Sequence, residues 1–163
     1  MLPPTDPDIL SLLPHRPPFL WVDRVLSLSG DAIETVKEIP ADLPLFQGHF
    51  PGHPVMPGVL LCEAVFQSGA ILIGAAADRH GEAGERFKGG VPLLTRIKEA
   101  RFKREVRPGD TIHIRVRLLE RVGNGWFLKG KVTVNGNTAV RVEFGCTLAD
   151  SPDRPPDPTG VKT

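Results

Sequence analysis

Residues 46–67 read FQGHFPGHPVMPGVLLCEAVFQ, and they join a loop rich in proline and glycine to a long apolar segment. The loop carries His49 and His53, and the apolar segment, Val59–Ala77, contains a single charged residue, Glu63. Burying a carboxylate among apolar side chains costs free energy unless it has a partner or a chemical task. We therefore expect His49 and Glu63 to act as an acid–base pair, and the rest of the chain to fold around this segment.

The apolar segment predicts a helix over about residues 57–77, because proline is favoured in the first turn of a helix. A helix that is apolar on every side either lies in a protein core or crosses a membrane. The polar residues Glu63 and Gln67 inside the segment, and the amphipathic strands expected around it, favour the core. The N-terminal sequence MLPPTDPD has neither the basic nor the apolar part of a signal peptide. We expect a cytoplasmic protein that does not span a membrane.

The chain of 163 residues has the length of one domain. Its 20 Lys and Arg residues nearly balance its 19 Asp and Glu residues, so the composition predicts neither nucleic acid nor an anionic membrane as a partner. Cys62 and Cys146 lie in apolar runs, which favours buried thiols in a reducing compartment over a disulfide. We expect one domain over residues 1–149 and a disordered tail at 150–163, which is rich in proline and has no apolar pattern.

The N-terminal region predicts a short helix over residues 4–13, with its isoleucine and leucines facing the core. The next seven-residue motif, LPHRPPF at 13–19, forms a rigid extended bend because its prolines disfavour helix. We expect His15 in this motif to have a structural role near a turn or a subunit interface.

Apolar and polar residues alternate in the rest of the chain, as they do in half-buried strands. The predicted strands, two before the helix and four after it, are Phe19–Leu28, Ala32–Ile39, Leu93–Lys103, Thr111–Leu118, Trp126–Val134 and Ala139–Leu148. Asn124-Gly125 and Asn135-Gly136 are typical of tight hairpins, which join antiparallel strands. The sequence therefore predicts an α+β fold in which an antiparallel six-stranded sheet wraps around one long central apolar helix.

Three blocks carry a resemblance to a known family. LPHRPPFLWVDRV at 13–25, the stretch at 46–67 quoted above, and EARFKREVRPGD at 99–110 resemble the (3R)-hydroxyacyl-acyl carrier protein dehydratases of bacterial fatty acid synthesis, and the match extends over roughly residues 9–148. The resemblance implies a hot-dog fold and an obligate homodimer, often a trimer of dimers (a homohexamer). It also implies that each active site takes His49 from one subunit and Glu63 from the other.

The implied reaction is that of a hydro-lyase: a 3-hydroxyacyl chain on the phosphopantetheine arm of acyl carrier protein loses water and becomes a trans-2-enoyl thioester. It needs a base at C2, an acid for the C3 hydroxyl, and stabilisation of the enolate oxygen. His49 suits the base, and Glu63, which we expect to be desolvated and to have a raised pKa, suits the acid. Gly58 at the helix N-terminus offers free backbone N–H groups as an oxyanion site, and Gln67, four residues after Glu63, orients the carboxyl group. The reaction needs no cofactor and no metal.

Other chemistry is less well supported by the sequence. His49 and His53 have the spacing of a metal pair on a helix, but the prolines and glycine between them exclude a helix, and no third ligand is evident. His49 alone could be a structural loop residue. A thiol nucleophile at Cys62 is not favoured, because neighbouring side chains on a helix point about 100° apart. We expect no metal site and a surface position for His53.

Two groups of residues bear on the partner and the substrate. The basic edge formed by Arg101, Lys103, Arg104 and Arg107 is either a solvated strand or a docking site for acyl carrier protein or the phosphate of its arm. Residues 92–98 depart from the family, which usually has aromatic residues and a Gly-Ile-Asp triplet there.

In this chain Leu93 (or the proline before it) stands in place of an aromatic gate of the acyl tunnel, and Arg96 and Lys98 replace the glycine and the aspartate. Simple alternation places both cations on the face of Leu94. We expect Leu93, Leu94, Arg96 and Lys98 to line or gate the tunnel, and to influence chain length more than the reaction. The alternatives to a dehydratase are a hot-dog hydratase or thioesterase that acts on acyl-CoA, and a non-catalytic subunit that binds carrier protein.

Overall fold

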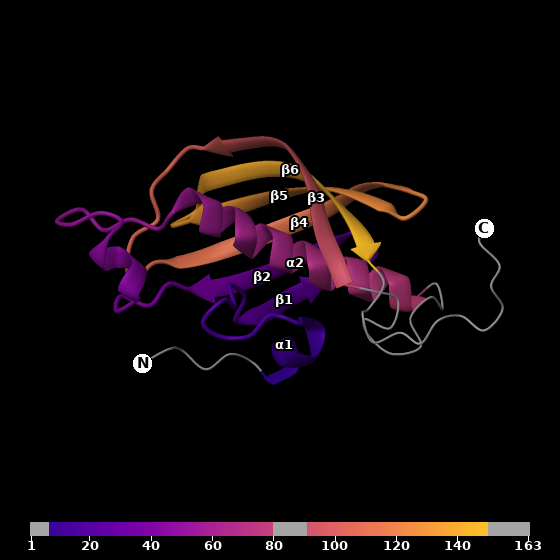
Figure 1. The fold of residues 1–163 in the computed structure, drawn as a ribbon, viewed down its shortest axis with the longest axis horizontal. Helices are drawn as coiled ribbons and strands as arrows, with labels where there is room; N and C mark the ends of the chain where they lie inside the picture. The colour runs from indigo at the N-terminus through magenta and orange to yellow at the C-terminus, as the bar shows by residue number, and fades with distance from the viewer. Residues whose placement is uncertain (1–6, 80–90, 150–163) are drawn as a thin grey trace.

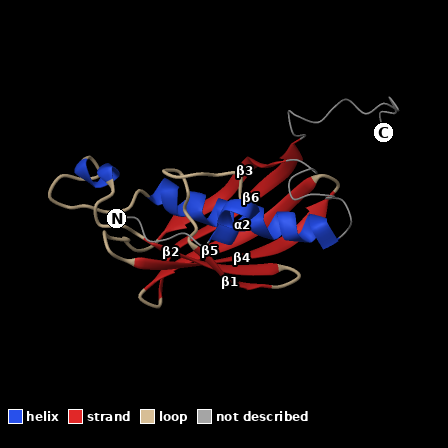
Figure 2. Ribbon diagram, turned by 90° about the horizontal axis from the view of Figure 1, so that it is seen from below, coloured by secondary structure: helices blue, strands red, loops and turns tan. Residues whose placement is uncertain are grey.

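The computed structural model describes residues 7–79 and 91–149 of the chain. Its elements, in chain order, are α1 (Pro7–Leu12), β1 (Arg24–Leu28), β2 (Ala32–Glu38), the short 3-10 helix η1 (Pro44–Gln47), α2 (Gly58–Arg79), β3 (Val91–Phe102), β4 (Thr111–Val122), β5 (Gly125–Val134) and β6 (Asn137–Ala149). The six strands form one antiparallel sheet in the order β1-β2-β4-β5-β6-β3. Figures 1 and 2 show α2 lying along one face of this sheet. The predicted α+β fold is confirmed, and the predicted tail at 150–163 lies outside the described residues.

The central helix is buried because the sheet curves around it. Leu61, Val65 and Ile71 of α2 are at most 2% exposed. The span Gly58–Ala77 is long and apolar enough to cross a membrane, but 67% of its most apolar window is buried inside the protein. The helix and the sheet approach so closely that a Cβ atom on Gly130 of β5 would lie 2.1 Å from Val65 Cγ1. A residue without a side chain is therefore required where α2 crosses β5.

The N-terminal elements are shorter than the sequence predicted. Within α1, Ile9 is buried, whereas Leu10 is 38% exposed, so the prediction that every leucine of this helix faces the core is wrong. Neighbouring side chains on a helix point about 100° apart, so this six-residue helix can bury only one of its faces against the protein. Strand β1 begins at Arg24 rather than Phe19, because the Trp21 N–H donates its hydrogen bond to the Gln67 side chain of α2 and not to a carbonyl of β2.

The hairpins between the last three strands agree with the predicted antiparallel order. Asn135-Gly136 joins β5 to β6, and both residues have positive φ (49° and 75°), as a type I′ turn requires. The β4–β5 loop is displaced by one residue from its prediction: it is Gly123-Asn124, and Gly125 is already paired with Val122 in the sheet.

Strand β3 lies at one edge of the sheet and is paired only with β6. Two irregularities shift its register, between Leu94 and Arg96 and between Ile97 and Glu99. A bulge sets two residues of one strand opposite a single residue of its neighbour, so the residues that follow it change face relative to simple alternation.

The prediction that Arg96 and Lys98 share a face with Leu94 is therefore wrong. Arg96 lies opposite an outward-facing glycine of β6, and Lys98 Nζ lies 3.2 Å from Glu143 Oε2 on the outer side of the sheet. Ile97 is the residue that lies opposite a buried phenylalanine on the side of the helix. Both cations are on the side of their own sheet that faces away from α2.

Replacing Gly130 with alanine tests the close contact between α2 and β5. We expect Gly130→Ala to lower the free energy of unfolding by about 1–3 kcal/mol, because the added methyl group must displace Val65 or the helix. Gly74→Ala is the matched control, since a Cβ atom at Gly74 in α2 meets nothing within 4 Å. It should stabilise the protein by up to about 1 kcal/mol through helix propensity. Urea denaturation of both variants measures the difference, and equal effects would contradict the packing argument.

Candidate active site

His49 is held in a defined orientation by the loop before α2. Its N–H donates to the Leu45 carbonyl (3.0 Å), and its own carbonyl accepts from the Val55 N–H (3.1 Å). The ring Nδ1 lies 2.8 Å from the Val55 carbonyl oxygen. Because a carbonyl only accepts, Nδ1 carries the proton, and Nε2 of the neutral ring keeps a free lone pair. His49 is therefore fixed in the tautomer that a base at Nε2 requires.

The residues that follow His49 form a tight turn. The His53 N–H donates to the Phe50 carbonyl (3.0 Å), with Pro51 and Gly52 (φ 77°) between them, as in a type II turn. This turn directs His53 to the surface, where Nε2 lies 3.3 Å from Glu105 Oε1 and the ring is 56% exposed. The surface position predicted for His53 is confirmed.

Glu63 lies in the second turn of α2 and is partly exposed. Gln67 Nε2 donates to Glu63 Oε1 at 2.9 Å, so the two side chains that helical spacing placed on one face do form a hydrogen bond. Gln67 is only 1% exposed and also bonds the N-terminal segment: its Oε1 accepts from the Trp21 N–H (2.8 Å), and its Nε2 donates to the Phe19 carbonyl (3.1 Å). One buried amide thus joins α2 to the segment before β1 and orients the carboxylate.

His15 is a neighbour of Glu63 that the sequence interpretation missed. Its Nε2 lies 3.6 Å from Glu63 Oε1, and its Nδ1 is buried without a hydrogen-bond partner among the described residues. The LPHRPPF motif positions it, because Arg16 donates to the Leu13 carbonyl (2.7 Å) and the Arg16 carbonyl accepts from the Phe19 N–H (2.9 Å). The sequence signal that could have drawn attention to His15 is its position between prolines in a rigid motif. That signal does not identify Glu63 as its partner, because Glu63 lies 48 residues further along the chain.

The two thiols near this site are not nucleophiles. Both are free and buried, as predicted. Burial raises the pKa of the Cys62 thiol to about 11. Burial, and then the charge of Glu63, raises the pKa of Cys146 to about 11. Both cysteines are therefore thiols rather than thiolates at neutral pH.

The N-terminus of α2 adjoins a surface pocket of about 510 Å³. The pocket is lined by Val55, Met56, Gly58, Val59, Leu61, Phe102, Lys103, Arg104 and Glu105. A Cβ atom on Gly58 would lie 2.6 Å from the Phe102 ring, so glycine allows this ring to cover the start of the helix. In the described part of the chain no group accepts from the Gly58 N–H. A free amide at a helix N-terminus is suited to bind a negatively charged oxygen.

The remaining predicted residues do not form one group. Lys103 and Arg104 line the pocket beside Gly58, whereas Arg101 Nε pairs with a glutamate on the outer face of β3 (2.6 Å) and Arg107 pairs with Glu105 (3.0 Å). Arg107, followed by His53, holds the pKa of the Glu105 carboxyl below its usual range.

Leu93 and Leu94, the predicted gate residues of β3, are 50% and 44% exposed. No cluster of three or more His, Cys, Asp or Glu side chains that could hold a metal is found in residues 7–79 and 91–149. Within the same residues His49 bonds to Val55 and Glu63 contacts His15 and Gln67, and no hydrogen bond or ion pair joins His49 to Glu63.

Comparison with known proteins places these features in a family. Residues 13–143 of this chain match the FabA-like domain family. A 3-hydroxyacyl-[acyl-carrier-protein] dehydratase FabZ of Oleidesulfovibrio alaskensis is 42% identical over 146 residues, covering 89% of this chain and 91% of that protein. A protein of the same name from Clostridium perfringens is 42% identical over 137 residues, covering 84% and 93%.

Solved structures share the fold at much lower identity. The dehydratase heterocomplex ApeI:P from Xenorhabdus doucetiae matches with a TM-score of 0.72 and 17% identity, covering 87% of this chain and 91% of that chain. The PaaI protein of E. coli, from the phenylacetic acid degradation operon, matches with a TM-score of 0.59 and 11% identity, covering 77% and 78%. These matches confirm the hot-dog fold.

Removing the amide of Gln67 tests whether it holds the site together. We expect Gln67→Leu to leave the Trp21 N–H and the Phe19 carbonyl unpaired, which costs about 1–3 kcal/mol for each buried group. Chemical denaturation measures the loss. Gln47→Leu, at an exposed position of η1, should change stability by less than about 0.5 kcal/mol. Similar stability of the two variants would show that the Gln67 contacts do not support the fold.

Proposed function

This chain belongs to the FabA-like family and is a 3-hydroxyacyl-acyl carrier protein dehydratase of fatty acid synthesis, and we propose that His49 and Glu63 perform its acid–base chemistry. The observation that carries the assignment is identity of 36–42% to dehydratases of this name over most of the chain. Hydratases or thioesterases of acyl-CoA and a non-catalytic subunit are not favoured. The thioesterases among the solved structures share 15% identity or less and therefore only the fold.

In the proposed reaction His49 Nε2 removes the proton from C2 of the 3-hydroxyacyl thioester. The electron pair of that C–H bond forms the enolate, whose oxygen accepts from the Gly58 N–H. Glu63 gives its proton to the C3 hydroxyl, the C–O bond breaks, and water leaves as the trans double bond forms between C2 and C3. His49 has then gained one proton and Glu63 has lost one, so a single proton returned from His49 to Glu63 restores the enzyme.

Gln67 and His15 are proposed to position Glu63 for this step. When Glu63 has given up its proton, its carboxylate accepts the Gln67 N–H at 2.9 Å and faces His15 Nε2 at 3.6 Å. Both contacts fix the position of the carboxyl group beside the leaving hydroxyl.

The site is proposed to be completed by a second copy of the chain. Three observations support this. Within the described residues of one chain, no hydrogen bond or ion pair joins His49 to Glu63. Val59 is 71% exposed on the helix face that carries Glu63, and β3 is an edge strand of 12 residues that pairs with β6 on one side only. Ile97 and Phe102 of β3 are about half exposed. Pairing of two β3 edges would continue the sheet and cover these apolar groups. We propose a homodimer, and a trimer of dimers is the further assembly that the family resemblance implies.

The carrier protein is proposed to dock beside the helix N-terminus. Lys103 and Arg104 are the two predicted docking residues that line the pocket at Gly58, where they could bind the phosphate of the phosphopantetheine arm or acidic side chains of the carrier. Arg107 adjoins them, whereas Arg101 faces the other side of the sheet. The substrate arrives on this arm, and the proposed chemistry uses no cofactor of the enzyme itself. We propose that the enzyme works in the cytoplasm.

Mixing two inactive variants tests the shared site. His49→Ala and Glu63→Gln should each lower the rate of crotonyl thioester hydration by ~10²–10⁴-fold. If the site takes one residue from each subunit, a mixed dimer has one intact site of two, and half of the dimers are mixed after random exchange. The mixture should therefore recover about a quarter of the wild-type activity.

The control is a mixture of His49→Ala with the double variant His49→Ala/Glu63→Gln, in which no site is intact. It should stay inactive. Absence of recovery in a verified mixture of the two single variants would place His49 and Glu63 in the same chain. Wild-type protein that is folded but inactive on carrier-protein and CoA thioesters would contradict the proposed function itself.

Substituting His15 tests its positioning role. We expect His15→Asn to lower kcat by up to about tenfold with little change in KM, because one contact to the carboxylate is lost while substrate binding is kept. His113→Asn, at an exposed position of β4, should leave both constants unchanged. A rise in KM alone, or equal effects of the two substitutions, would show that His15 does not act through Glu63.

A further inference from the structure

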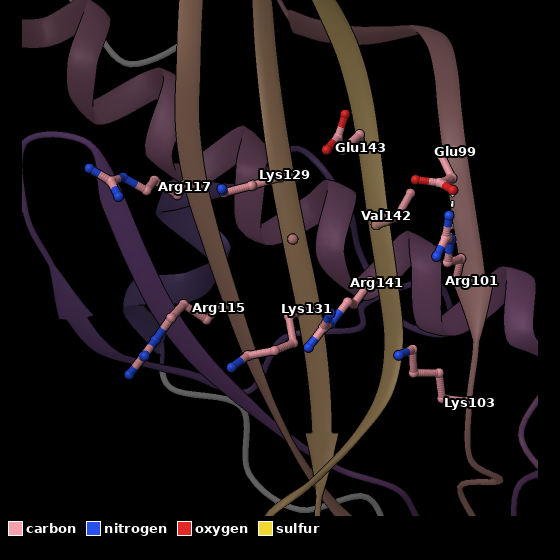
Figure 3. Close-up of a pocket in the computed structure, with 11 residues that line it drawn as sticks. Glu99, Arg101, Lys103, Arg115, Arg117, Lys129, Lys131, Arg141, Val142 and Glu143 are labelled. Carbon is pink, nitrogen blue, oxygen red and sulfur yellow. Dashed lines mark hydrogen bonds and ion pairs between the residues drawn. The ribbon is translucent and has the colours of Figure 1, made fainter.

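The outer face of the sheet, away from α2, carries a groove of about 530 Å³ across β4, β5, β6 and β3. The groove is lined by Glu99, Arg101, Lys103, Arg115, Arg117, Lys129, Gly130, Lys131, Arg141, Val142 and Glu143. Seven of these residues are cationic and two are acidic, although the whole chain has a net charge of only +1. Figure 3 shows the long cationic side chains standing on the strands of this face.

Four of the cations lie in one row across the sheet. Arg115 is opposite Lys131, Lys131 is opposite Arg141, and Arg141 is opposite Arg101. We call these four residues the cationic ladder. Since neighbouring strands are about 4.8 Å apart, the ladder spans roughly 14 Å. Like charges placed directly opposite each other destabilise a sheet, so this arrangement opposes folding rather than supporting it.

Neutralisation within the chain is incomplete at the centre of the ladder. At its ends, Arg115 pairs with Glu34 (2.6 Å) and Arg101 pairs with Glu99 (2.6 Å). Lys131 and Arg141, between them, have no ion pair or hydrogen bond from their side chains within the described residues. The two central cations are therefore available to an external anion.

The next row of the same face distinguishes between kinds of anion. It begins with Arg117 and Lys129 and continues with Glu143 and Glu99, so its charge changes sign across the sheet. A uniform polyanion laid over the groove would meet the two acids as well as the cations. None of the lining residues is aromatic, so the groove offers no surface on which bases of a single-stranded nucleic acid could stack. A protein surface of mixed charge matches this pattern better.

We propose that the cationic ladder docks an acidic helix of a partner protein. Acidic residues at i, i+3, i+7 and i+10 lie on one side of a helix and span about 15 Å, close to the length of the ladder. The ladder lies on the opposite side of the sheet from Glu63, so such a partner stays bound while substrate enters on the side of α2. This inference goes beyond the proposed function and does not depend on it.

Binding of designed peptides tests the proposal. The probe is a fluorescein-labelled helical peptide with four glutamates at i, i+3, i+7 and i+10, and its control has the same composition with the glutamates spread around the helix. We expect fluorescence anisotropy to show binding of the patterned peptide to wild type about tenfold tighter than binding of the control peptide. Lys131→Gln/Arg141→Gln should lose about the same factor, and added salt should weaken binding.

The matched control protein carries Arg24→Gln, which removes one exposed charge from the opposite edge of the sheet and should bind like wild type. Thermal melting at low salt shows whether the ladder variant folds, and we expect its Tm to be equal to or above that of wild type. Equal affinity for the two peptides, or full affinity in the ladder variant, would overturn the proposal. Tighter binding of a single-stranded oligonucleotide or of inorganic polyphosphate than of the patterned peptide would assign the groove to another class of ligand.

Discussion

The structure depends on covering a helix of 22 residues that is apolar on nearly every side. An isolated sheet covers only one side of such a helix, so the strands curve around α2, and glycine at position 130 lets the two backbones approach. The segment before β1 covers a further side of the helix through the bonds of Gln67 to residues 19 and 21. One strip stays uncovered, and it contains Val59 and Glu63.

Gln67 links the stability of the fold to the geometry of the site. Its amide offers one oxygen and two N–H groups, and these are used by Trp21, Phe19 and Glu63. The orientation of the Glu63 carboxylate is therefore set by the same bonds that hold the N-terminal segment against α2. A carboxylate held in this way does not need to be reorganised during the reaction, which is the condition for efficient electrostatic catalysis.

Much of this arrangement follows from patterns along single segments. The apolar run predicted α2, the alternation of apolar and polar residues predicted the strands of the sheet, and the spacing of four residues predicted the contact of Gln67 with Glu63. The outward position of Arg96 and Lys98 did not follow, because a bulge arises from pairing with another strand. The contact of His15 with Glu63 and the register that aligns Lys131 with Arg141 likewise join distant parts of the chain, and no local pattern encodes them.

The uncovered strip of α2 connects the proposed dimer to the proposed acid–base chemistry. In the proposed dimer the surface that covers Val59 would also cover Glu63, which is 22% exposed in the single chain. The same cover would exclude water from the reacting groups. The same contact would bring a second His49, whose Nε2 lone pair is already directed by the bond from Nδ1 to Val55. On this argument the single chain holds both groups in their correct orientations but in separate places, and assembly unites them.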